Sequence, residues 1–411
     1  MSDAPTVVGG MDPSSRRPRV LVLAPAYLPG FRSGGPIVSL SRLVEAAPNV
    51  DFFILTRDRE LGNSEPYDVA EPHVWVEVGS AHVSYLRPRL RDFLWSMREM
   101  RRMRPDVVYV NGIWNFSFHI LPLLTRRTLL RRGSVLVVAP RGAFSPLGLK
   151  MGRWKKAPLS PLIRWLHDEP MIWQVTSQRE LGEVHSWWSG TLPPDQRVVV
   201  SPNLPPIPHE PLQFSDTTLD RRVTFASRID RSKGLLEAVK ACSLIGVPCQ
   251  LYVYGPLQDA AYWHECHDWA ARHAPTVRMT YEGTYKPNQA QALFQKSTLL
   301  LLPTLFENFS HVVAEALSVG CPVVLKPTTP WGREIENPGV FLGTKPSELS
   351  HHVSSILRLD PNAEALLRSK TLDAYSSWFK SASVEALRIV DEFLRCSSQN
   401  TDRSSPERPQ G

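Results

Sequence analysis

The chain has 411 residues, enough for two domains that each bury a core of their own. Its apolar content of 42% and charged content of 21% are ordinary for a soluble protein. No window approaches ~18 uninterrupted apolar residues, so we expect no membrane-spanning helix. The first residues lack an apolar core ahead of their arginines, so we do not expect a secretory signal.

The cysteine count indicates the cellular compartment, and the distribution of charge indicates which partners the protein could bind. The five cysteines are odd in number and form no C-x-x-C pair, which fits a reducing cytoplasm and argues against a zinc cluster. Residues 1–205 hold 26 Lys and Arg against 18 Asp and Glu, a net charge of +8, whereas the remainder has a net charge of −1. An anionic membrane surface is one partner for such a half. Nucleic acid is not expected, because no zinc-finger, helix-turn-helix or aromatic RNA-binding motif is present.

The first half alternates apolar strands with helical patterns. Residues 1–16 are polar and lack periodicity, so they are predicted to be disordered. The alternation predicts a parallel sheet covered on both faces, within a domain at 17–201. The expected strands are RVLVLAP (19–25), DFFILT (51–56), DVVYVN (106–111), SVLVVAP (134–140), IWQVTS (172–177) and RVVVSPN (197–203).

A second alternating series follows a proline-dense segment. Residues 202–214 are predicted to be a linker, and residues 215–375 a second domain. Its expected strands are RRVTFAS (221–227), PCQLYVYG (248–255), VRMTYEG (277–283), STLLLLPT (297–304), CPVVLKP (321–327) and GVFLG (339–343). The pattern predicts an α/β protein of two doubly wound, Rossmann-like domains facing a cleft, with ligands outside the carboxyl ends of the strands.

Nine residues, ENFSHVVAE (307–315), carry the most information about function. Glu307 is expected in a strand-to-helix loop, and Glu315 inside a helix at 310–319 capped by Asn308 or Ser310. A helix N-terminus offers N–H groups to a phosphate, and the two carboxylates flank it. The spacing alone would equally fit a loop cap and a surface helix residue.

The wider segment resembles the E-x7-E motif of retaining glycosyltransferases of family 4, which have the GT-B fold. The likeness continues through Gly320 and Pro322 to Trp331. The resemblance implies that Glu307 contacts the transferred sugar and that Glu315 binds the ribose hydroxyls. It implies further donor contacts at Phe309, Ser310, His311 and Val312. This chain departs from the usual pattern at Ser310, where glycine is common, and at His311.

The resemblance extends to cationic and glycine-rich loops. Arg228 and Lys233, in FASRIDRSKG, look like a clamp on the donor diphosphate, because the two cations can neutralise a departing phosphate. Gly34 and Gly35 follow the first strand and are similar in place to a loop that lies against the diphosphate. Arg141 stands where many relatives have His. It cannot shuttle a proton as His does, so we assign it to donor binding.

The acceptor side is less sharply marked. Trp114, Asn115 and His119 lie in a segment similar to the one that faces the acceptor in the exopolysaccharide branch of the family. Trp114 is equally compatible with a core position, and His119 is more often a helix residue than a catalyst. The carboxylates of the TRDRELG segment (56–62) have the D-x-E spacing of metal sites in GT-A enzymes, but a polar loop is the better interpretation.

Two basic stretches, RPRLRDFLWSMREMRRMR (87–104) and LKMGRWKKAPLSPLIRWL (149–166), mix cations with aromatic residues. Such stretches suit a membrane interface, and a charged face over a core stripe is an equal alternative. The resemblance also implies that a helix at 376–396 returns to the first domain, and residues 397–411 are expected to be a disordered tail.

Together with these features, the resemblance implies a cytoplasmic hexosyltransferase of polysaccharide biosynthesis, either free or peripheral at the inner face of the membrane. It would move a hexose, with retention, from a nucleotide-sugar to a hydroxyl of a glycan or lipid-linked glycan. It would need no metal and no cofactor, because Arg228 and Lys233 supply positive charge and the nucleotide-sugar is a substrate. The alternatives are a GT-B phosphorylase and a non-catalytic sugar-binding scaffold.

Overall fold

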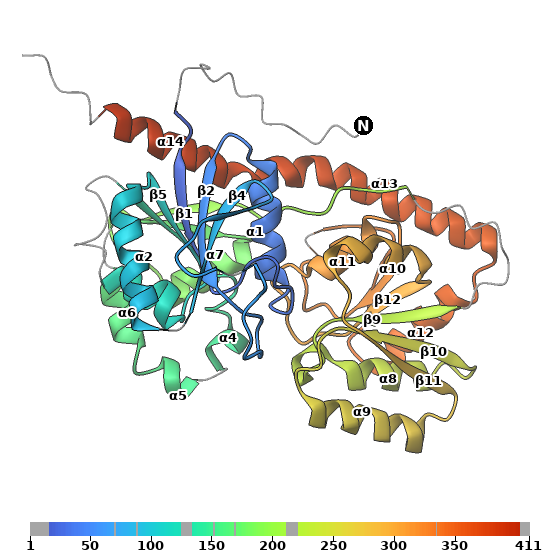
Figure 1. The fold of residues 1–411 in the computed structure, drawn as a ribbon. Helices are drawn as coiled ribbons and strands as arrows, with labels where there is room; N and C mark the ends of the chain where they lie inside the picture. The colour runs from blue at the N-terminus through green and yellow to red at the C-terminus, as the bar shows by residue number, and fades with distance from the viewer. Residues whose placement is uncertain are drawn as a thin grey trace, which may run out of the picture. The chain divides into compact units, whose positions relative to one another are not determined.

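The computed structural model describes residues 16–69, 71–87, 89–124, 134–150, 153–167, 170–210, 221–333 and 335–402. The chain divides into two compact units (Figure 1). The first unit comprises residues 1–204 and 383–411, and the second comprises residues 205–382. The expected disordered N-terminus lies outside the described residues, except for Arg16.

The first unit is built on an eight-stranded sheet of order β3-β4-β2-β1-β5-β6-β7-β8. Every neighbouring pair is parallel except β3 with β4. The strand order reverses between β1 and β5, which therefore form the topological switch point of this sheet. The strands are β1 Arg19–Leu23, β2 Asp51–Arg57, β3 Val76–Val78, β4 Ala81–Leu86, β5 Val107–Asn111, β6 Val135–Ala139, β7 Ile172–Val175 and β8 Arg197–Val200.

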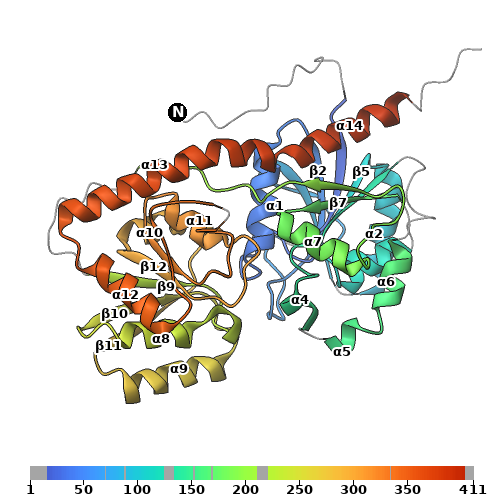
Figure 2. The ribbon, with the colours of Figure 1, turned by 180° about the vertical axis from the view of Figure 1, so that it is seen from behind.

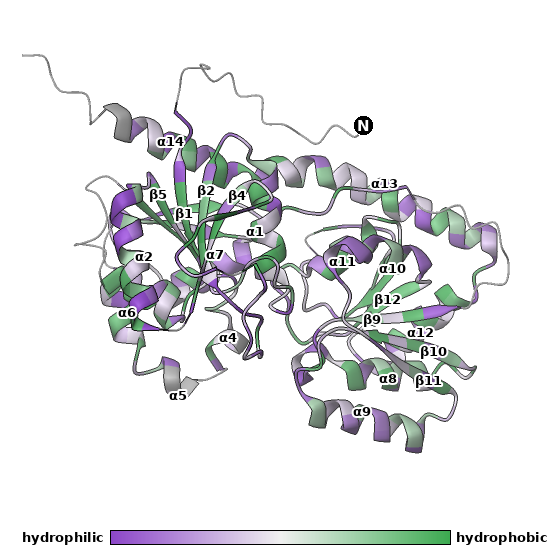
Figure 3. Ribbon diagram, viewed as in Figure 1, coloured by the Kyte–Doolittle hydropathy of each residue, from purple (hydrophilic) through white to green (hydrophobic). Residues whose placement is uncertain are grey.

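Both faces of this sheet are buried, because its central strands are apolar at consecutive positions. Val20 and Val22 of β1 pack with α1 and α14 on one face, while Leu21 and Leu23 pack with α2, α6 and α7 on the other. Figure 3 shows the apolar colour running along these strands. The helices are α1 Gly35–Ala46, α2 Leu90–Met103, a π-helical turn Phe116–Ile120, α4 Pro146–Lys150, α5 Arg153–Lys156, α6 Ser160–Leu166, α7 Gln178–Trp187 and α14 Arg388–Asp402.

The second unit contains a six-stranded, wholly parallel sheet of order β11-β10-β9-β12-β13-β14. Numbered within the unit, this order is 3-2-1-4-5-6, the arrangement of nucleotide-binding Rossmann domains, with its switch point between β9 and β12. The strands are β9 Arg222–Ala226, β10 Cys249–Tyr254, β11 Val277–Gly283, β12 Leu299–Leu302, β13 Val323–Leu325 and β14 Val340–Leu342.

Helices from the whole length of this unit enclose one apolar core. The four leucines of β12 and most residues of β9 are fully buried within it. The helical segments are a 3-10 turn Arg231–Lys233, α8 Leu235–Ser243, α9 Ala260–His273, a 3-10 turn Pro287–Gln289, α10 Ala290–Lys296, α11 His311–Leu317, α12 Pro346–Leu357 and α13 Pro361–Ala386.

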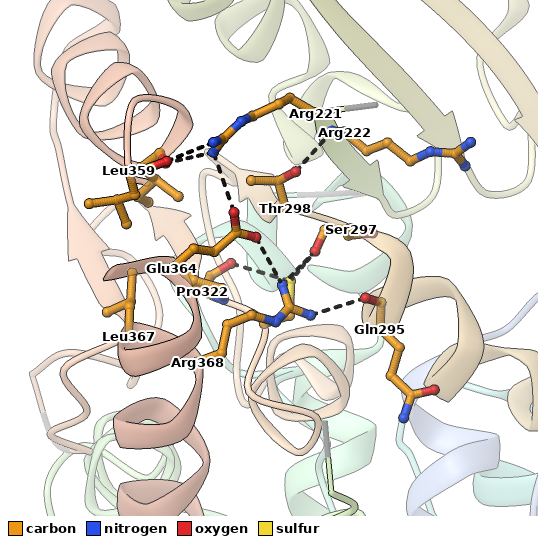
Figure 4. A network of polar contacts seen from close by, with 12 residues as sticks. Arg221, Arg222, Gln295, Ser297, Thr298, Pro322, Leu359, Glu364, Leu367 and Arg368 are labelled. Atoms are coloured by element: carbon orange, nitrogen blue, oxygen red, sulfur yellow. Dashed lines mark hydrogen bonds and ion pairs between the residues drawn. The ribbon is translucent and has the colours of Figure 1, made fainter. Parts of the chain in front are cut away.

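Buried arginine contacts fix α13 to the second unit. Arg368 donates to the carbonyl oxygens of Ser297 at 2.8 Å and of Gln295 at 3.1 Å, at the amino end of β12 (Figure 4). Arg221 donates to the Leu359 carbonyl oxygen at 2.6 Å, and Glu364 lies 3.3 Å from Arg221. The Arg368 contacts supply hydrogen-bond donors to buried carbonyl oxygens.

The C-terminal region forms two helices, α13 and α14 (Figure 2). α13 begins at Pro361 as part of the second unit, and the chain enters the first unit at Ser383, before α13 ends and later than the boundary at 376 given for the returning helix. The expected disordered tail is wrong for residues 397–402, which belong to α14. Residues 403–411 lie outside the described part of the chain.

All twelve expected strands are present. β2 is one residue longer than predicted, β11 has the predicted length, and the other ten are one to four residues shorter. The prediction missed β3 and β4, where His82 and Ser84 interrupt the apolar pattern. β4 nevertheless pairs with β2 over six residues. No helix in the described ranges is both long and apolar enough to cross a membrane.

Candidate active site

The three residues predicted to be catalytic lie in two loops at the switch point of the second unit. Arg228 and Lys233 follow β9, and Glu307 follows β12, its neighbour in the sheet. The carboxyl ends of adjacent parallel strands share one edge of a sheet, so the two loops lie together. The Lys233 Nζ atom is 2.5 Å from the Glu307 Oε1 atom.

This ion pair is largely enclosed. The side chain of Lys233 is 11% exposed and that of Glu307 is 17% exposed. A charge-assisted bond this short fixes both groups, and their partial exposure leaves each accessible to a ligand.

Backbone contacts hold the two loops in register. The Leu305 N–H donates to the Ser232 carbonyl oxygen at 2.8 Å, and the Thr304 hydroxyl donates to the same oxygen at 3.2 Å. Asp230 caps the turn before Lys233 by accepting from the Ser232 N–H at 2.8 Å. On the other side, the Thr328 hydroxyl donates to the Thr304 carbonyl oxygen at 2.6 Å.

Gly234 allows the loops to approach this closely. It has φ +78°, and a Cβ atom there would lie 2.3 Å from the Pro303 carbonyl oxygen. Only glycine satisfies both the left-handed backbone and the contact. Gly234 thus sets the spacing between the residue that carries the cation and the strand that leads to Glu307.

Arg228 is more exposed than Lys233. Its Nη1 atom donates to Gln258 Oε1 at 2.9 Å, and its Nη2 atom lies 3.8 Å from Asp230 Oδ2. The side chain is 38% exposed. Such contacts orient the guanidinium without burying it, so it remains free to pair with an anion.

The segment from Glu307 to Glu315 departs from the predicted helix cap. The helix runs over His311–Leu317, and Ser310 is its N-cap in a left-handed conformation, φ 67° and ψ 79°. The Ser310 hydroxyl makes no capping hydrogen bond and is buried without a partner among the described residues. Glycine would adopt this conformation without strain, which explains the usual residue of the resembling motif.

Glu315 and Phe309 are buried on this segment, whereas His311 and Val312 are partly exposed. The Trp331 indole N–H donates to the Phe309 carbonyl oxygen at 2.6 Å. The two rings are 5.7 Å apart. The Trp331 ring thus fixes the backbone between the two carboxylates.

In the first unit, Gly34 and Gly35 lie at the start of α1, after β1 at the switch point. Gly34 has φ 64° and open space where a Cβ atom would stand. The Phe31 N–H in the same loop donates to Glu60 Oε2 at 2.8 Å. Glu60 therefore shapes the glycine-rich loop.

Arg141 follows β6 with a positive φ of 56°. Its Nε donates to Asn111 Oδ1 at 2.8 Å, its Nη1 to Asn203 Oδ1 at 2.6 Å and its Nη2 to the Tyr109 hydroxyl at 2.7 Å. The guanidinium is thus held at the carboxyl edge of the sheet by neutral groups. None of these three partners was identified from the sequence, because they lie far from Arg141 in the chain.

The acceptor-side residues have different surroundings. Trp114 is partly exposed, with φ 71°, and packs on Trp187 with ring centroids 5.5 Å apart. Asn115 caps the π-helical turn by accepting from the Phe118 N–H at 3.0 Å. His119 is fully buried, with its Nε2 atom 3.0 Å from that of His167.

Burial lowers the pKa of His119 to about 3, so the ring is neutral at ordinary pH. It faces the core and not the surface, which removes His119 from the residues that can touch an acceptor in this conformation. No group of three or more His, Cys, Asp or Glu side chains suited to a metal occurs in the part of the chain that the structure describes.

Comparison with known proteins agrees with this geometry. Residues 214–370 match the family described as glycosyl transferases group 1, which covers less than half of the chain and includes all the switch-point residues of the second unit. No curated protein matches the sequence.

Solved structures match over nearly the whole chain. Sucrose-phosphate synthase from Thermosynechococcus elongatus is similar with a TM-score of 0.69 and 15% identity, over 92% of this chain and 100% of that one. HepE from Anabaena, in complex with UDP and glucose, matches with a TM-score of 0.63 and 15% identity, over 91% and 99%.

A UDP-forming α,α-trehalose-phosphate synthase from Burkholderia xenovorans, in complex with glucose-6-phosphate, has a TM-score of 0.62 and 11% identity, over 92% and 100%. Identities this low establish the fold alone. The chain therefore has the GT-B fold of two Rossmann-like units, and its second unit matches the glycosyl transferases of group 1.

Proposed function

We propose that the protein is a retaining glycosyltransferase that moves a hexose from a nucleotide-sugar to a hydroxyl of a lipid-linked glycan in polysaccharide biosynthesis. The observation that carries this proposal is the enclosed Lys233–Glu307 pair at the switch point, with Arg228 on the same loop. A cation for the diphosphate and a carboxylate for the sugar stand 2.5 Å apart, as a donor with adjoining phosphate and sugar requires.

In this mechanism the donor diphosphate binds Lys233 and Arg228, and Glu307 accepts from the hydroxyls of the transferred sugar. Glu315 holds the ribose, while the backbone at Phe309 to Val312 contacts the phosphates. The acceptor oxygen forms a bond to the anomeric carbon of the transferred sugar. The bond between that carbon and the donor phosphate breaks at the same time, and the proton of the acceptor hydroxyl passes to the leaving phosphate. The two cations stabilise the charge that develops on that phosphate, where fixed charges accelerate a reaction most.

The first unit supplies the remaining contacts. Gly34 and Gly35 let the backbone approach the diphosphate, and Arg141 adds a third cation for the donor. Trp114 and Asn115 contact the acceptor by stacking and hydrogen bonding. The reaction needs no metal ion. The protein acts on the cytoplasmic side of an anionic membrane, to which exposed aromatic and cationic side chains attach it peripherally. Trp154 and Trp165, which are 77% and 61% exposed, support that attachment.

A thermal-shift screen against UDP-, GDP- and ADP-sugars tests donor binding. A ligand at ~100 times its dissociation constant adds ~2.7 kcal/mol of stability, a readily measured shift. Transfer of a radiolabelled sugar from the selected donor to lipid extracts then tests catalysis, and NMR of the product gives the anomeric configuration. Turnover with free phosphate in place of the nucleotide would instead indicate a phosphorylase. Donor binding without transfer to any acceptor would favour a sugar-binding scaffold.

A further inference from the structure

The side chain of Arg141 is held by three neutral hydrogen-bond partners and has no carboxylate partner within the described ranges. Three of its five N–H donors are used by the neutral oxygens of Asn111, Asn203 and Tyr109. All three partners are buried, so their positions are fixed. No ion pair of Arg141 occurs within the described ranges.

The charge of Arg141 is therefore positioned but not neutralised by a direct partner. Glu180, the carboxylate attached to the same loop, is occupied elsewhere: its oxygens accept from the Gly142 N–H at 2.5 Å and from the Thr176 N–H and hydroxyl at 2.7 Å each. Arg141 also has a left-handed backbone, which costs a non-glycine residue energy. A partly buried cation in a strained, pre-set orientation is suited to a ligand anion.

Asn203 differs from the other two partners in its place in the chain. It lies beyond β8, one residue before the last residue of the first unit's initial segment, Leu204. Ser201, two residues earlier, makes three hydrogen bonds. The Ser201 N–H donates to Val175 at 2.8 Å, its hydroxyl donates to the Ala386 carbonyl oxygen at 2.7 Å, and its carbonyl oxygen accepts from Gln174 at 3.3 Å.

The same network returns to Arg141 by a second route. Gln174 Oε1 accepts from the Tyr109 hydroxyl at 2.6 Å, and that hydroxyl accepts from Arg141. The segments by which the chain leaves the first unit and re-enters it are thus bonded to each other and to the residues that hold Arg141.

We infer that Asn203 is a positioning residue, which holds the Arg141 guanidinium toward an anionic group of the nucleotide-sugar from the segment where the chain leaves the first unit. The inference rests on the proposed function, in which Arg141 binds the donor. Its specific content is that a neutral acceptor is required at position 203. A carboxylate there would keep the hydrogen bond but neutralise the cation that the ligand needs.

Two substitutions separate this role from a structural one. Asn203→Ala removes the acceptor and leaves the charge of Arg141, whereas Asn203→Asp keeps an acceptor of the same shape and adds a paired charge. Titration calorimetry with UDP, GDP and ADP measures binding without relying on activity. Asn362→Asp is the matched control, because Asn362 is exposed on the first turn of α13 and the change adds the same charge.

We expect nucleotide affinity to fall about fivefold in Asn203→Ala, less than the full worth of a bond to a charged group because Asn111 and Tyr109 still hold Arg141, and tenfold or more in Asn203→Asp. The melting temperature of Asn203→Asp should equal or exceed that of the wild type, since an ion pair is gained. Asn362→Asp should bind as the wild type does.

Equal affinity of Asn203→Asp and the wild type for a nucleotide that both bind would overturn the inference and leave the proposed function standing. So would an Asn203→Asp that binds more tightly than Asn203→Ala. A wild type that binds none of the three nucleotides would instead count against the proposed function itself.

Discussion

Replacing Gly234 by alanine should push apart the two loops that carry Lys233 and Glu307. Gly246→Ala, at a second glycine with a positive φ, measures the backbone strain alone. Gly234 and Gly246 have nearly the same φ, +78° and +79°, but only Gly234 faces an obstacle: its Cβ would lie 2.3 Å from the Pro303 carbonyl oxygen, whereas nothing lies within 4 Å at Gly246. A left-handed alanine costs ~1–2 kcal/mol at either position. Overpacking against the fixed Pro303 carbonyl adds ~1–3 kcal/mol at Gly234 alone.

We therefore expect Gly234→Ala to lower the free energy of unfolding by ~2–5 kcal/mol and Gly246→Ala by ~1–2 kcal/mol. Urea unfolding with linear extrapolation measures both. Because Pro303 leads into the loop of Glu307, Gly234→Ala should also weaken binding of the donor nucleotide, while Gly246→Ala should not. Equal destabilisation of the two variants, with nucleotide affinity intact in both, would refute the account of how the two loops are spaced.

Three further outcomes follow from the charges and the burial. Transfer should persist in EDTA, because Arg228 and Lys233 supply the positive charge; complete loss restored by manganese or magnesium would contradict this. Anionic vesicles should sediment the protein at low salt and release it at high salt, and replacing Trp154 and Trp165 by alanine should weaken attachment; a wild type that stays in the supernatant would point to a soluble acceptor. Burial lowers the pKa of His119 to about 3, so the unfolded chain takes up a proton there first as the pH falls below ~6.5, and His119 by itself should lower stability by ~2 kcal/mol between pH 7 and pH 5. Burial raises the pKa of Glu183 to about 7, which acts in the opposite direction, so the His119 share is the difference in pH dependence between the wild type and His119→Leu. Urea unfolding of both proteins at pH 7 and pH 5 measures that difference, and equal pH dependence of the two would contradict the prediction.

The pattern of the sequence predicted the strands because each is a short apolar run between turn residues. The pattern predicted secondary structure and backbone conformation less well where tertiary contacts determine them. β4 is polar at two of its six positions, yet it pairs with β2 along its whole length. The conformation of Ser310 is likewise fixed by its surroundings, since serine alone does not favour a left-handed cap.

The candidate site shows the same division. Glu307, Lys233 and Arg228 were identified from local motifs, and the structure places the first two in contact across 74 residues of chain. The partners of Arg141 are 30, 32 and 62 residues away from it, and no local pattern marks them. The burial of His119 against His167 was equally invisible, because it depends on how two distant helical segments pack.

The central claim is that Glu307 acts on the transferred sugar while Glu315 holds the nucleotide. The most direct measurement compares Glu307→Gln and Glu315→Gln for both sugar transfer and nucleotide affinity. Glu307→Gln should cut transfer by about 10²-fold or more, the scale of losing a charge aimed at the reacting centre, with nucleotide affinity within about threefold of the wild type. Glu315→Gln should instead weaken nucleotide affinity about tenfold, as expected for a lost charged hydrogen bond. A Glu307→Gln protein that transfers sugar at the wild-type rate would contradict the account.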